Sequence, residues 1–349
     1  MADTTQHFLP TAMGLAARLT IAALQKRKVP PAPLLKRAGL LRGDIDDPHG
    51  RVSAAGQARF LEYAAAVLDD SALGLHLAEH ANPKEAGLLF YAMSAARTLA
   101  EALTLFARYS RIANDSVRLR LESAEDGTIV DVSYVGIWRQ HARQFTEFGM
   151  ALSVKAFREM AGRKIRPIRV ACSHGRNANL REFERFYGCA VEFGAPFDLM
   201  KFSDETLSTA LVTHDPYLLE TLRPFCDEAA AARSTPAGTL RAAVENEIQR
   251  LLPHGKAHAE IVAKSLAVSV RTLSRRLSEE GTSFVEIVDQ LRHSLAIEYL
   301  KEPSFTIAQV TWLLGYEGTT SFNHAFKRWT GKASSAFRTE GSSVHRRAL

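Results

Sequence analysis

Two short stretches near the carboxyl end carry side chains of the types that contact base edges in double-stranded DNA. Arginine can donate two parallel hydrogen bonds to O6 and N7 of guanine, asparagine pairs with N6 and N7 of adenine, and serine or threonine contacts a base edge or a thymine methyl group. The candidate base-reading residues are Arg271, Thr272, Ser274 and Arg275 in the first stretch and Thr319, Thr320, Asn323 and His324 in the second. Lys327 and Arg338 are candidates for phosphate contacts, which fix position without reading sequence.

Both stretches lie in the second helix of a repeated helix-turn-helix pattern. The first copy predicts helices over 260–267 and 270–281, and the second predicts helices over 306–316 and 319–329. The expected core is Ile261 or Val262, Leu266, Val268, Leu273 and Leu277 in the first copy, and Ile307, Val310, Leu314, Phe322 and Phe326 in the second. Gly315 suits a helix end that needs a positive φ.

The spacing of the two copies fits the repeat of a DNA duplex. Arg275 and Asn323 occupy matching places 48 residues apart, and 284–300 reads as one continuous helix that connects the copies. Successive major-groove faces lie about 34 Å apart, so two rigidly spaced units can meet neighbouring turns of one duplex. The alternative for any single helix of this kind is a solvated surface, and it is the duplication that favours DNA binding.

A composition change divides the chain into two domains. Alanines at 229–232 give way to Ser, Thr, Pro and Gly before position 239, which predicts a linker over 233–239. From position 240 onward there are 15 Lys and Arg against 11 Asp and Glu, a net charge of +4 out of +6 for the chain. We therefore expect one domain over 1–232, a DNA-binding domain over 240–340 and a flexible tail over 341–349.

The two domains differ in their hydrophobic period. Helical spacing over 11–24, 54–69, 99–112 and 140–162 accompanies strand patterns over 117–121, 129–134, 168–171 and 190–193. This mixture predicts an α+β domain with helices around a small, mostly antiparallel sheet, followed by an all-α domain with two helix-turn-helix units joined by a long helix. The apolar face of 140–162 is expected to be core packing, with a ligand cavity as the alternative; it comprises Phe145, Phe148, Leu152, Ala156 and Met160.

The carboxy-terminal motifs resemble the DNA-binding domain of the AraC/XylS family of bacterial transcriptional regulators. The resemblance rests on 268–277 with Gly281 after it, on Gly315-Tyr316, on 321–331 and on Phe337-Arg338. The sequence departs from the family pattern at Ser334, where proline is usual, at Thr311, where alanine is usual, and at Glu317-Gly318. These departures imply that the second unit binds DNA less tightly or less selectively than the first.

The amino-terminal part resembles an effector domain of a subgroup of these regulators, of the type labelled arabinose-binding. The matching segments are 47–52, 74–79 and 98–103, together with Tyr109. The resemblance implies a cytoplasmic transcriptional activator that forms homodimers, senses a small-molecule effector and contacts RNA polymerase. No residue of the sequence indicates arabinose or marks the effector pocket.

An enzyme is the main rival, and an architectural DNA-binding protein without a ligand is another. The sequence lacks a phosphate-binding loop, a dinucleotide fingerprint, a zinc-protease helix and a nucleophile elbow. Cys172-Ser173-His174 could be a nucleophile and its base, but neighbours on a strand point to opposite faces. We expect no catalytic residue and no cofactor.

The remaining signals concern metals, disulfides and membranes. His254 and His258 lie four residues apart without a third ligand nearby, so surface histidines are favoured over a metal site. Three unevenly spaced cysteines predict reduced thiols in a cytoplasmic protein rather than a disulfide framework. The apolar stretch 11–24 is shorter than the roughly 20 residues of a bilayer span and contains Arg18, so no membrane partner is expected.

Overall fold

The computed structural model describes residues 10–47, 50–134, 137, 142–176, 178–233, 240–252, 255–301 and 306–338. The chain forms two compact units, Met1–Thr235 and Pro236–Leu349. Of the predicted linker only Arg233 is described, and the predicted tail over 341–349 lies outside the described residues.

A five-stranded sheet organises the first unit. Its strands are β3 (Val117–Ala124), β4 (Gly127–Tyr134), β5 (Arg169–Cys172), β6 (Val191–Phe193) and β7 (Asp198–Phe202), in the order β3-β4-β7-β5-β6. All neighbours are antiparallel except β5 and β6, which are parallel. The predicted mostly antiparallel sheet is confirmed, although the sequence reasoning missed β7, which lies at its centre.

The predicted hairpin of β3 and β4 is confirmed with its turn. The two strands pair from Val117 opposite Tyr134 to Ala124 opposite Gly127. Gly127 has a φ of 144°, and a Cβ placed there would lie 2.0 Å from the carbonyl oxygen of Phe202. Only glycine fits at this position, because the turn brings the hairpin against the end of β7.

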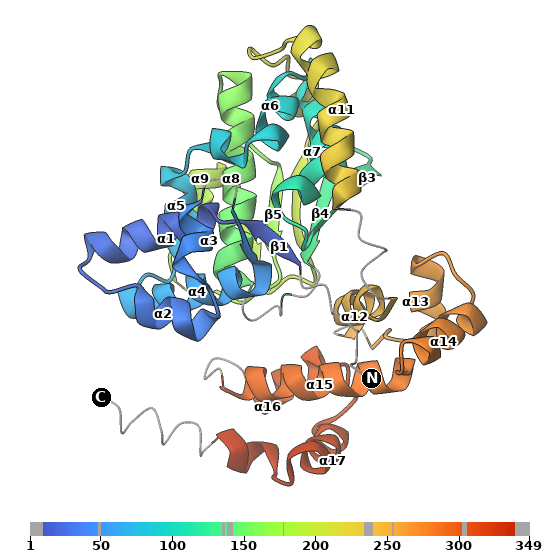
Figure 1. The fold of residues 1–349 in the computed structure, drawn as a ribbon. Helices are drawn as coiled ribbons and strands as arrows, with labels where there is room; N and C mark the ends of the chain where they lie inside the picture. The colour runs from blue at the N-terminus through green and yellow to red at the C-terminus, as the bar shows by residue number, and fades with distance from the viewer. Residues whose placement is uncertain are drawn as a thin grey trace, which may run out of the picture. The chain divides into compact units, whose positions relative to one another are not determined.

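Helices surround this sheet, and a two-stranded ribbon of β1 and β2 lies near the start of the unit. The elements are β1 (Thr11–Met13), α1 (Leu15–Lys26), α2 (Ala32–Ala38), α3 (Arg42–Asp46), β2 (Arg51–Ser53), α4 (Ala54–Leu68), α5 (Leu73–His80), η1 (Pro83–Ala86), α6 (Leu88–Ser94), α7 (Leu99–Ala113), α8 (Arg143–Ala161), α9 (Leu180–Tyr187), α10 (Asp204–Leu207) and α11 (Pro216–Ala232). In Figure 1 the blue helices α1 to α4 form a group beside the green helix α8.

The long helix α8 carries much of the core of the first unit. Phe157 is fully buried, and its ring meets the rings of Phe106 on α7 and Phe202 on β7 at centroid distances of 6.2 and 5.8 Å. Four of the five residues of the predicted apolar face are buried, and Leu152 is half-buried. The 3.6-residue period therefore identified the inward side of this helix correctly.

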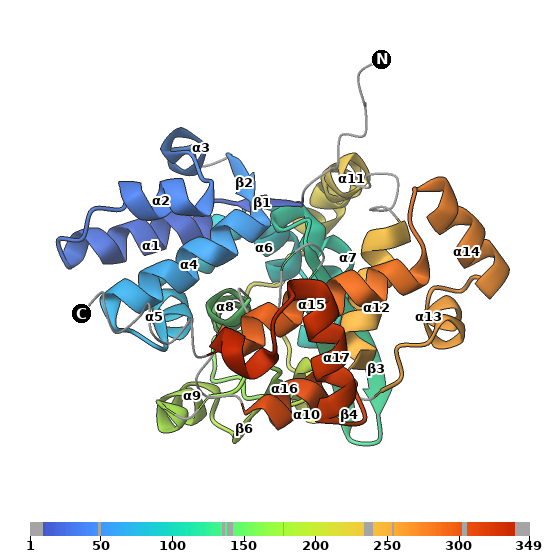
Figure 2. The same ribbon diagram turned by 90° about the horizontal axis from the view of Figure 1, so that it is seen from below.

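The described part of the second unit is helical throughout, as predicted. It contains α12 (Leu240–Leu251), α13 (Ala259–Ser265), α14 (Val270–Glu279), α15 (Phe284–Lys301), α16 (Ile307–Leu313) and α17 (Thr319–Thr330). The central helix α15 packs against α12, α16 and α17, as Figures 1 and 2 show. Its buried residues Ile287, Leu291 and Leu295 join the two helix-turn-helix units into one core.

The hydropathy of the helices bears on a possible membrane span in the described residues. None of their helices combines the length and the hydropathy needed to cross a bilayer.

Candidate nucleic-acid interface

The first helix-turn-helix unit consists of α13 and α14. Ser269 caps α14, because its hydroxyl oxygen accepts a hydrogen bond from the backbone N–H of Thr272 at 3.1 Å. Leu273 and Leu277 are buried against Val262, whereas Ile261 is 38% exposed. Of the two residues that the sequence left open, Val262 is the core residue.

Because Leu273 and Leu277 are buried, the opposite side of α14 faces solvent. Arg271, Ser274 and Arg275 are exposed, so the helix presents three of the four predicted base-reading residues. Thr272 differs, because it is half-buried and its hydroxyl lies 2.9 Å from that of Ser269. Its side chain takes part in the helix cap, which adds a local role that the sequence reasoning did not foresee.

Arg275 is held by an ion pair that is easily exchanged. Its Nη1 lies 2.9 Å from Oε1 of Glu279 one turn later, and the two side chains are 64% and 59% exposed. Exposed pairs at this spacing contribute only about 0.3 to 0.5 kcal/mol. The guanidinium can therefore leave Glu279 for a base edge at small cost.

The second unit consists of α16 and α17 and has an aromatic core. Thr306 and Gln309 form a reciprocal capping box at the start of α16. Phe322 and Phe326 on α17 are fully buried, and the ring of Phe326 meets that of Phe337 at 5.5 Å. These contacts fix α17 from one side along its length.

Gly315 ends α16 as the sequence predicts. Its φ is +68°, and a Cβ at this position would lie 2.3 Å from the carbonyl oxygen of Leu252. Thr311, which stands where the family usually has alanine, is buried and donates its hydroxyl proton to the carbonyl of Ile307 at 2.8 Å. The extra hydroxyl is therefore satisfied within α16.

The outer side of α17 shows most of the predicted residues. Thr319, Thr320, His324 and Lys327 are exposed. Asn323 is half-buried, and its Oδ1 accepts a hydrogen bond from the hydroxyl of Ser334 at 2.5 Å. Ser334 is fully buried and stands where the family usually has proline, so this departure from the family pattern acts directly on a predicted base-reading residue.

Two residues of α15 that sequence reasoning missed hold the second unit in place. Arg292 donates to the carbonyl oxygens of Leu314 and Gly315 at 3.0 and 3.3 Å and lies over the ring of Tyr316. Asp289 accepts hydrogen bonds from Arg328 at 2.6 Å and from the indole of Trp329 at 2.9 Å. Asp289 and Arg292 lie three residues apart on the connector, and this spacing places them on neighbouring positions of one helix face.

Arg338 lies near the end of the described chain and is half-buried. Its assignment as a phosphate contact stays a prediction, as do the roles of the other interface residues.

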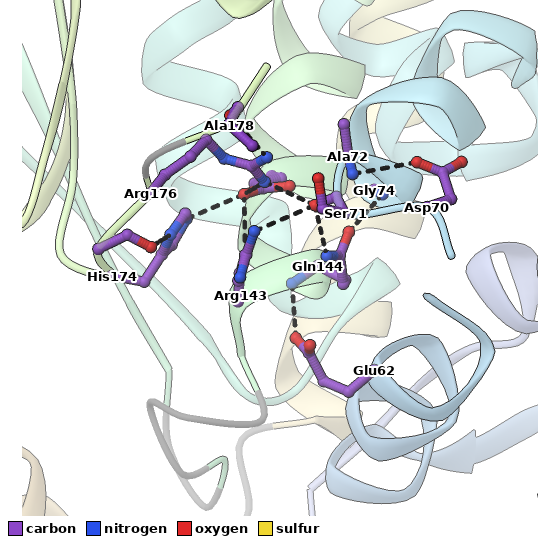
Figure 3. Close-up of polar contacts among 12 residues, drawn as sticks. Glu62, Asp70, Ser71, Ala72, Gly74, Arg143, Gln144, His174, Arg176 and Ala178 are labelled. Atoms are coloured by element: carbon purple, nitrogen blue, oxygen red, sulfur yellow. Dashed lines mark hydrogen bonds and ion pairs between the residues drawn. The ribbon is translucent and has the colours of Figure 1, made fainter. Parts of the chain in front are cut away.

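The first unit contains a buried polar cluster centred on Glu147 of α8. Figure 3 shows Arg143, His174 and Arg176 pointing toward one another, and all three pair with the Glu147 carboxylate. Burial raises the pKa of Glu147 to about 7 against the opposing pull of Arg176. Gln144, which follows Arg143, accepts a hydrogen bond from the backbone N–H of Gly74 at 2.7 Å and so joins α8 to α5 beside this cluster.

Comparison with known proteins gives these two units their family. Residues 29–211 match the model of the arabinose-binding domain of AraC transcription regulators, N-terminal, and residues 262–340 match a helix-turn-helix domain model. The chain belongs to the AraC family of transcription regulators. Like the other members that share both domains, it is a DNA-binding transcriptional regulator with an effector-type amino-terminal domain.

Two curated AraC-family relatives span most of the chain. The ornithine utilization regulator of Pseudomonas aeruginosa is 27% identical over 84% of this chain and 86% of its own length. The transcriptional regulator VirS of Mycobacterium tuberculosis is 28% identical over 89% of this chain and 91% of its own. The crystal structure of the regulator CdpR from P. aeruginosa is 23% identical, with a TM-score of 0.46 over 93% of this chain and 98% of that chain.

In this AraC-family chain the suspected nucleophile and base do not assemble. Burial raises the pKa of the Cys172 thiol well above its usual value, which opposes thiolate formation. Ser173 donates its hydroxyl proton to Asp198 at 3.0 Å, and His174 faces Glu147. Ser173 and His174 therefore make separate structural contacts, and Cys172 is a buried free thiol.

The suspected metal site receives no support from the described residues. His254 lies outside them, and His258 is exposed just before α13. In the described ranges, no group of three or more His, Cys, Asp or Glu side chains is arranged to hold a metal ion.

Proposed function

We propose that this AraC-family chain is a cytoplasmic, effector-controlled transcriptional activator that binds DNA as a homodimer and contacts RNA polymerase. In this proposal residues 1–232 bind the effector and dimerise, 233–239 form the linker, and 240–340 bind DNA. The chain is then a regulator and not an enzyme.

Each reading helix enters one of two successive major grooves. The first groove receives Arg271, Thr272, Ser274 and Arg275, and the second receives Thr319, Thr320, Asn323 and His324. Lys327 and Arg338 contact phosphates. The observation that carries this assignment is that α14 and α17 each bury one apolar stripe in a shared core and expose the opposite side, with α15 fixing both within one unit.

Two exposed aromatic residues support dimerisation through the first unit. Tyr217 and Phe225 on α11 are 80% and 57% exposed. Large exposed aromatic side chains are enriched at the centres of protein interfaces. A Tyr217→Ser and Phe225→Ser double variant is expected to shift the mass measured by sedimentation equilibrium from dimer to monomer, and an unchanged mass would remove this assignment.

Effector control requires unequal affinity of the effector for two states of the protein. The test is fluorescence anisotropy of labelled duplexes from the neighbourhood of the gene, with the full chain and a panel of metabolites. We expect one duplex to bind at least 1,000-fold more tightly than a shuffled duplex, the order of discrimination typical of specific regulators, and one metabolite to change that affinity. Transcription by purified RNA polymerase from the same duplex then tests activation.

An architectural DNA-binding role is the outcome that would replace this proposal. It follows if every duplex of equal length binds with equal affinity and no metabolite changes either affinity or melting temperature.

A further inference from the structure

The first unit contains a partly open apolar cavity of about 160 Å³. It lies between the amino-terminal helical region and the sheet, with walls from α1, α4, η1, α6, α7 and α8 and from strands β1, β3, β4 and β7. Phe145 and Phe148 of the predicted apolar face of α8 line it. The apolar face of α8 therefore lines a cavity as well as packing into the core.

Methionine is concentrated in the wall of this cavity. Of the six methionines in the chain, Met13, Met93, Met150 and Met200 line it, and they come from four different elements. Unbranched thioether side chains adapt to ligand shape and make favourable contacts with aromatic rings. Side chains of this kind can adjust to the shape of an apolar ligand after it enters the cavity.

The wall offers few polar groups to a ligand. Among its described residues Glu85 alone carries a charge, and it is paired with Arg18 at 3.3 Å. The side-chain amide of Gln57 already forms hydrogen bonds within the protein. Its Oε1 accepts from the backbone N–H of Ala17, and its Nε2 donates to the carbonyl of Met13. An anionic ligand would lack a cation here, and a sugar would bury hydroxyl groups without enough partners.

The volume of the cavity limits how much of a ligand it can bury. A dry cavity of about 150 Å³ lined by Leu, Ile and Phe is known to hold benzene. A space of about 160 Å³ accommodates one six-membered ring or an aliphatic chain of similar volume.

We propose that this cavity binds an uncharged, largely apolar small molecule of about one aromatic ring, and that a sugar is not its ligand. This assignment rests on the proposed function in identifying the bound molecule with the effector. The cavity and its chemistry stand on the contacts of the first unit alone.

The test uses NMR of the full chain labelled with [methyl-¹³C]methionine. Toluene is the probe, and benzoate and arabinose are matched comparisons that add a negative charge or hydroxyl groups. We expect toluene to shift the methyl signals of Met13, Met93, Met150 and Met200 and to leave Met160 unchanged, since Met160 is buried but does not line the cavity. Absence of these shifts at saturating toluene, or equal shifts with arabinose, overturns the proposal.

A blocked variant gives a second readout. Ala156→Leu adds volume inside the wall, whereas Ala66→Leu makes the same change on an exposed side of α4. Toluene at about five times its Kd is expected to raise the melting temperature of the native chain and of Ala66→Leu by about 2 to 4 °C. It is expected to have no effect on Ala156→Leu, and an equal rise in all three proteins overturns the proposal.

If Ala156→Leu does not fold, the toluene-induced shifts of the methionine signals in the native chain decide whether the cavity binds an apolar ligand. DNA anisotropy of the native chain without toluene separates the two proposals. If the chain shows no sequence-selective binding, the proposed function fails and the NMR result still stands. Selective DNA binding without methionine shifts removes the cavity ligand alone.

Discussion

The two helix-turn-helix units share a plan but hold their reading helices differently. In the first, Leu273 and Leu277 bury one side of α14, and Arg275 pairs with the exposed Glu279. In the second, a buried aromatic cluster holds α17, and Asn323 is hydrogen-bonded to the buried Ser334. A side chain that contacts only solvent and an exchangeable partner can rearrange onto a base, whereas one fixed by a buried hydroxyl must first give up that bond.

This comparison predicts a division of labour between the units. The first unit is expected to supply most of the base discrimination, and the second mainly to position the protein on the duplex. Four substitutions test this division, and their expected effects decrease in the order given.

The largest effect is expected from Phe326→Ala. The side chain is fully buried between Phe322 and Phe337, so its removal leaves a cavity and is expected to lower the free energy of unfolding of the second unit by about 3 to 5 kcal/mol. Urea denaturation followed by circular dichroism measures it. Thr319→Ala, on the exposed side of the same helix, is the control and should change stability by less than about 0.5 kcal/mol.

Arg275→Ala tests the reading role of the first unit. Loss of a bidentate contact to guanine is expected to cost about 1 to 3 kcal/mol on the specific duplex and to relax the preference at one base pair. Glu279→Gln removes the ion pair and keeps the guanidinium, so its affinity should stay within about twofold of native. Equal losses on specific and shuffled duplexes in anisotropy measurements would contradict the assignment.

Ser334→Pro tests whether the hydroxyl restrains Asn323. Ser334 begins the short helical segment at 334–338, a place where proline is tolerated. Since one hydrogen bond contributes about 0.5 to 1.5 kcal/mol, its removal is expected to tighten specific binding by about 2- to 10-fold. Ser334→Ala should give a similar gain, and the gain should vanish in an Asn323→Ala background; a gain that persists there argues against the restraint.

Lys327→Ala is expected to have the smallest effect and the least dependence on sequence. Loss of one phosphate contact reduces the slope of log K against log salt by about 0.9 and weakens all duplexes alike. Lys28→Ala makes the same charge change on an exposed position of the first unit and should leave the slope unchanged. A loss confined to the specific duplex would instead place Lys327 at a base edge.

Local patterns predicted much of the fold. The β3–β4 hairpin, the inward side of α8 and the four helices of the repeated motif were predicted because each depends on residues near one another in sequence. The central strand β7 was missed because its five residues carry little local signal. Its place in the sheet is set by pairing with β4 and β5, which lie 26 or more residues earlier in the sequence.

The same limit applies to the candidate interface. Exposure of Arg271, Ser274 and Arg275 followed from the period of α14, but the cap contact of Thr272 and the bond between Asn323 and Ser334 did not. The latter joins residues 11 apart across a helix end, a distance at which helical spacing gives no information. The anchors Asp289 and Arg292 act through contacts more than 20 residues away, which only the packed unit brings together.

If both units read one operator as proposed, the continuous connector α15 also limits which operators fit. Its 18 residues span about 27 Å, and each residue added or removed would swing everything beyond it by about 100°. One extra base pair between the two halves of a binding site moves the far half by about 3.4 Å and rotates it by about 34°. A rigid connector of this kind makes the spacing between the two half-sites as strict a requirement as their base sequence.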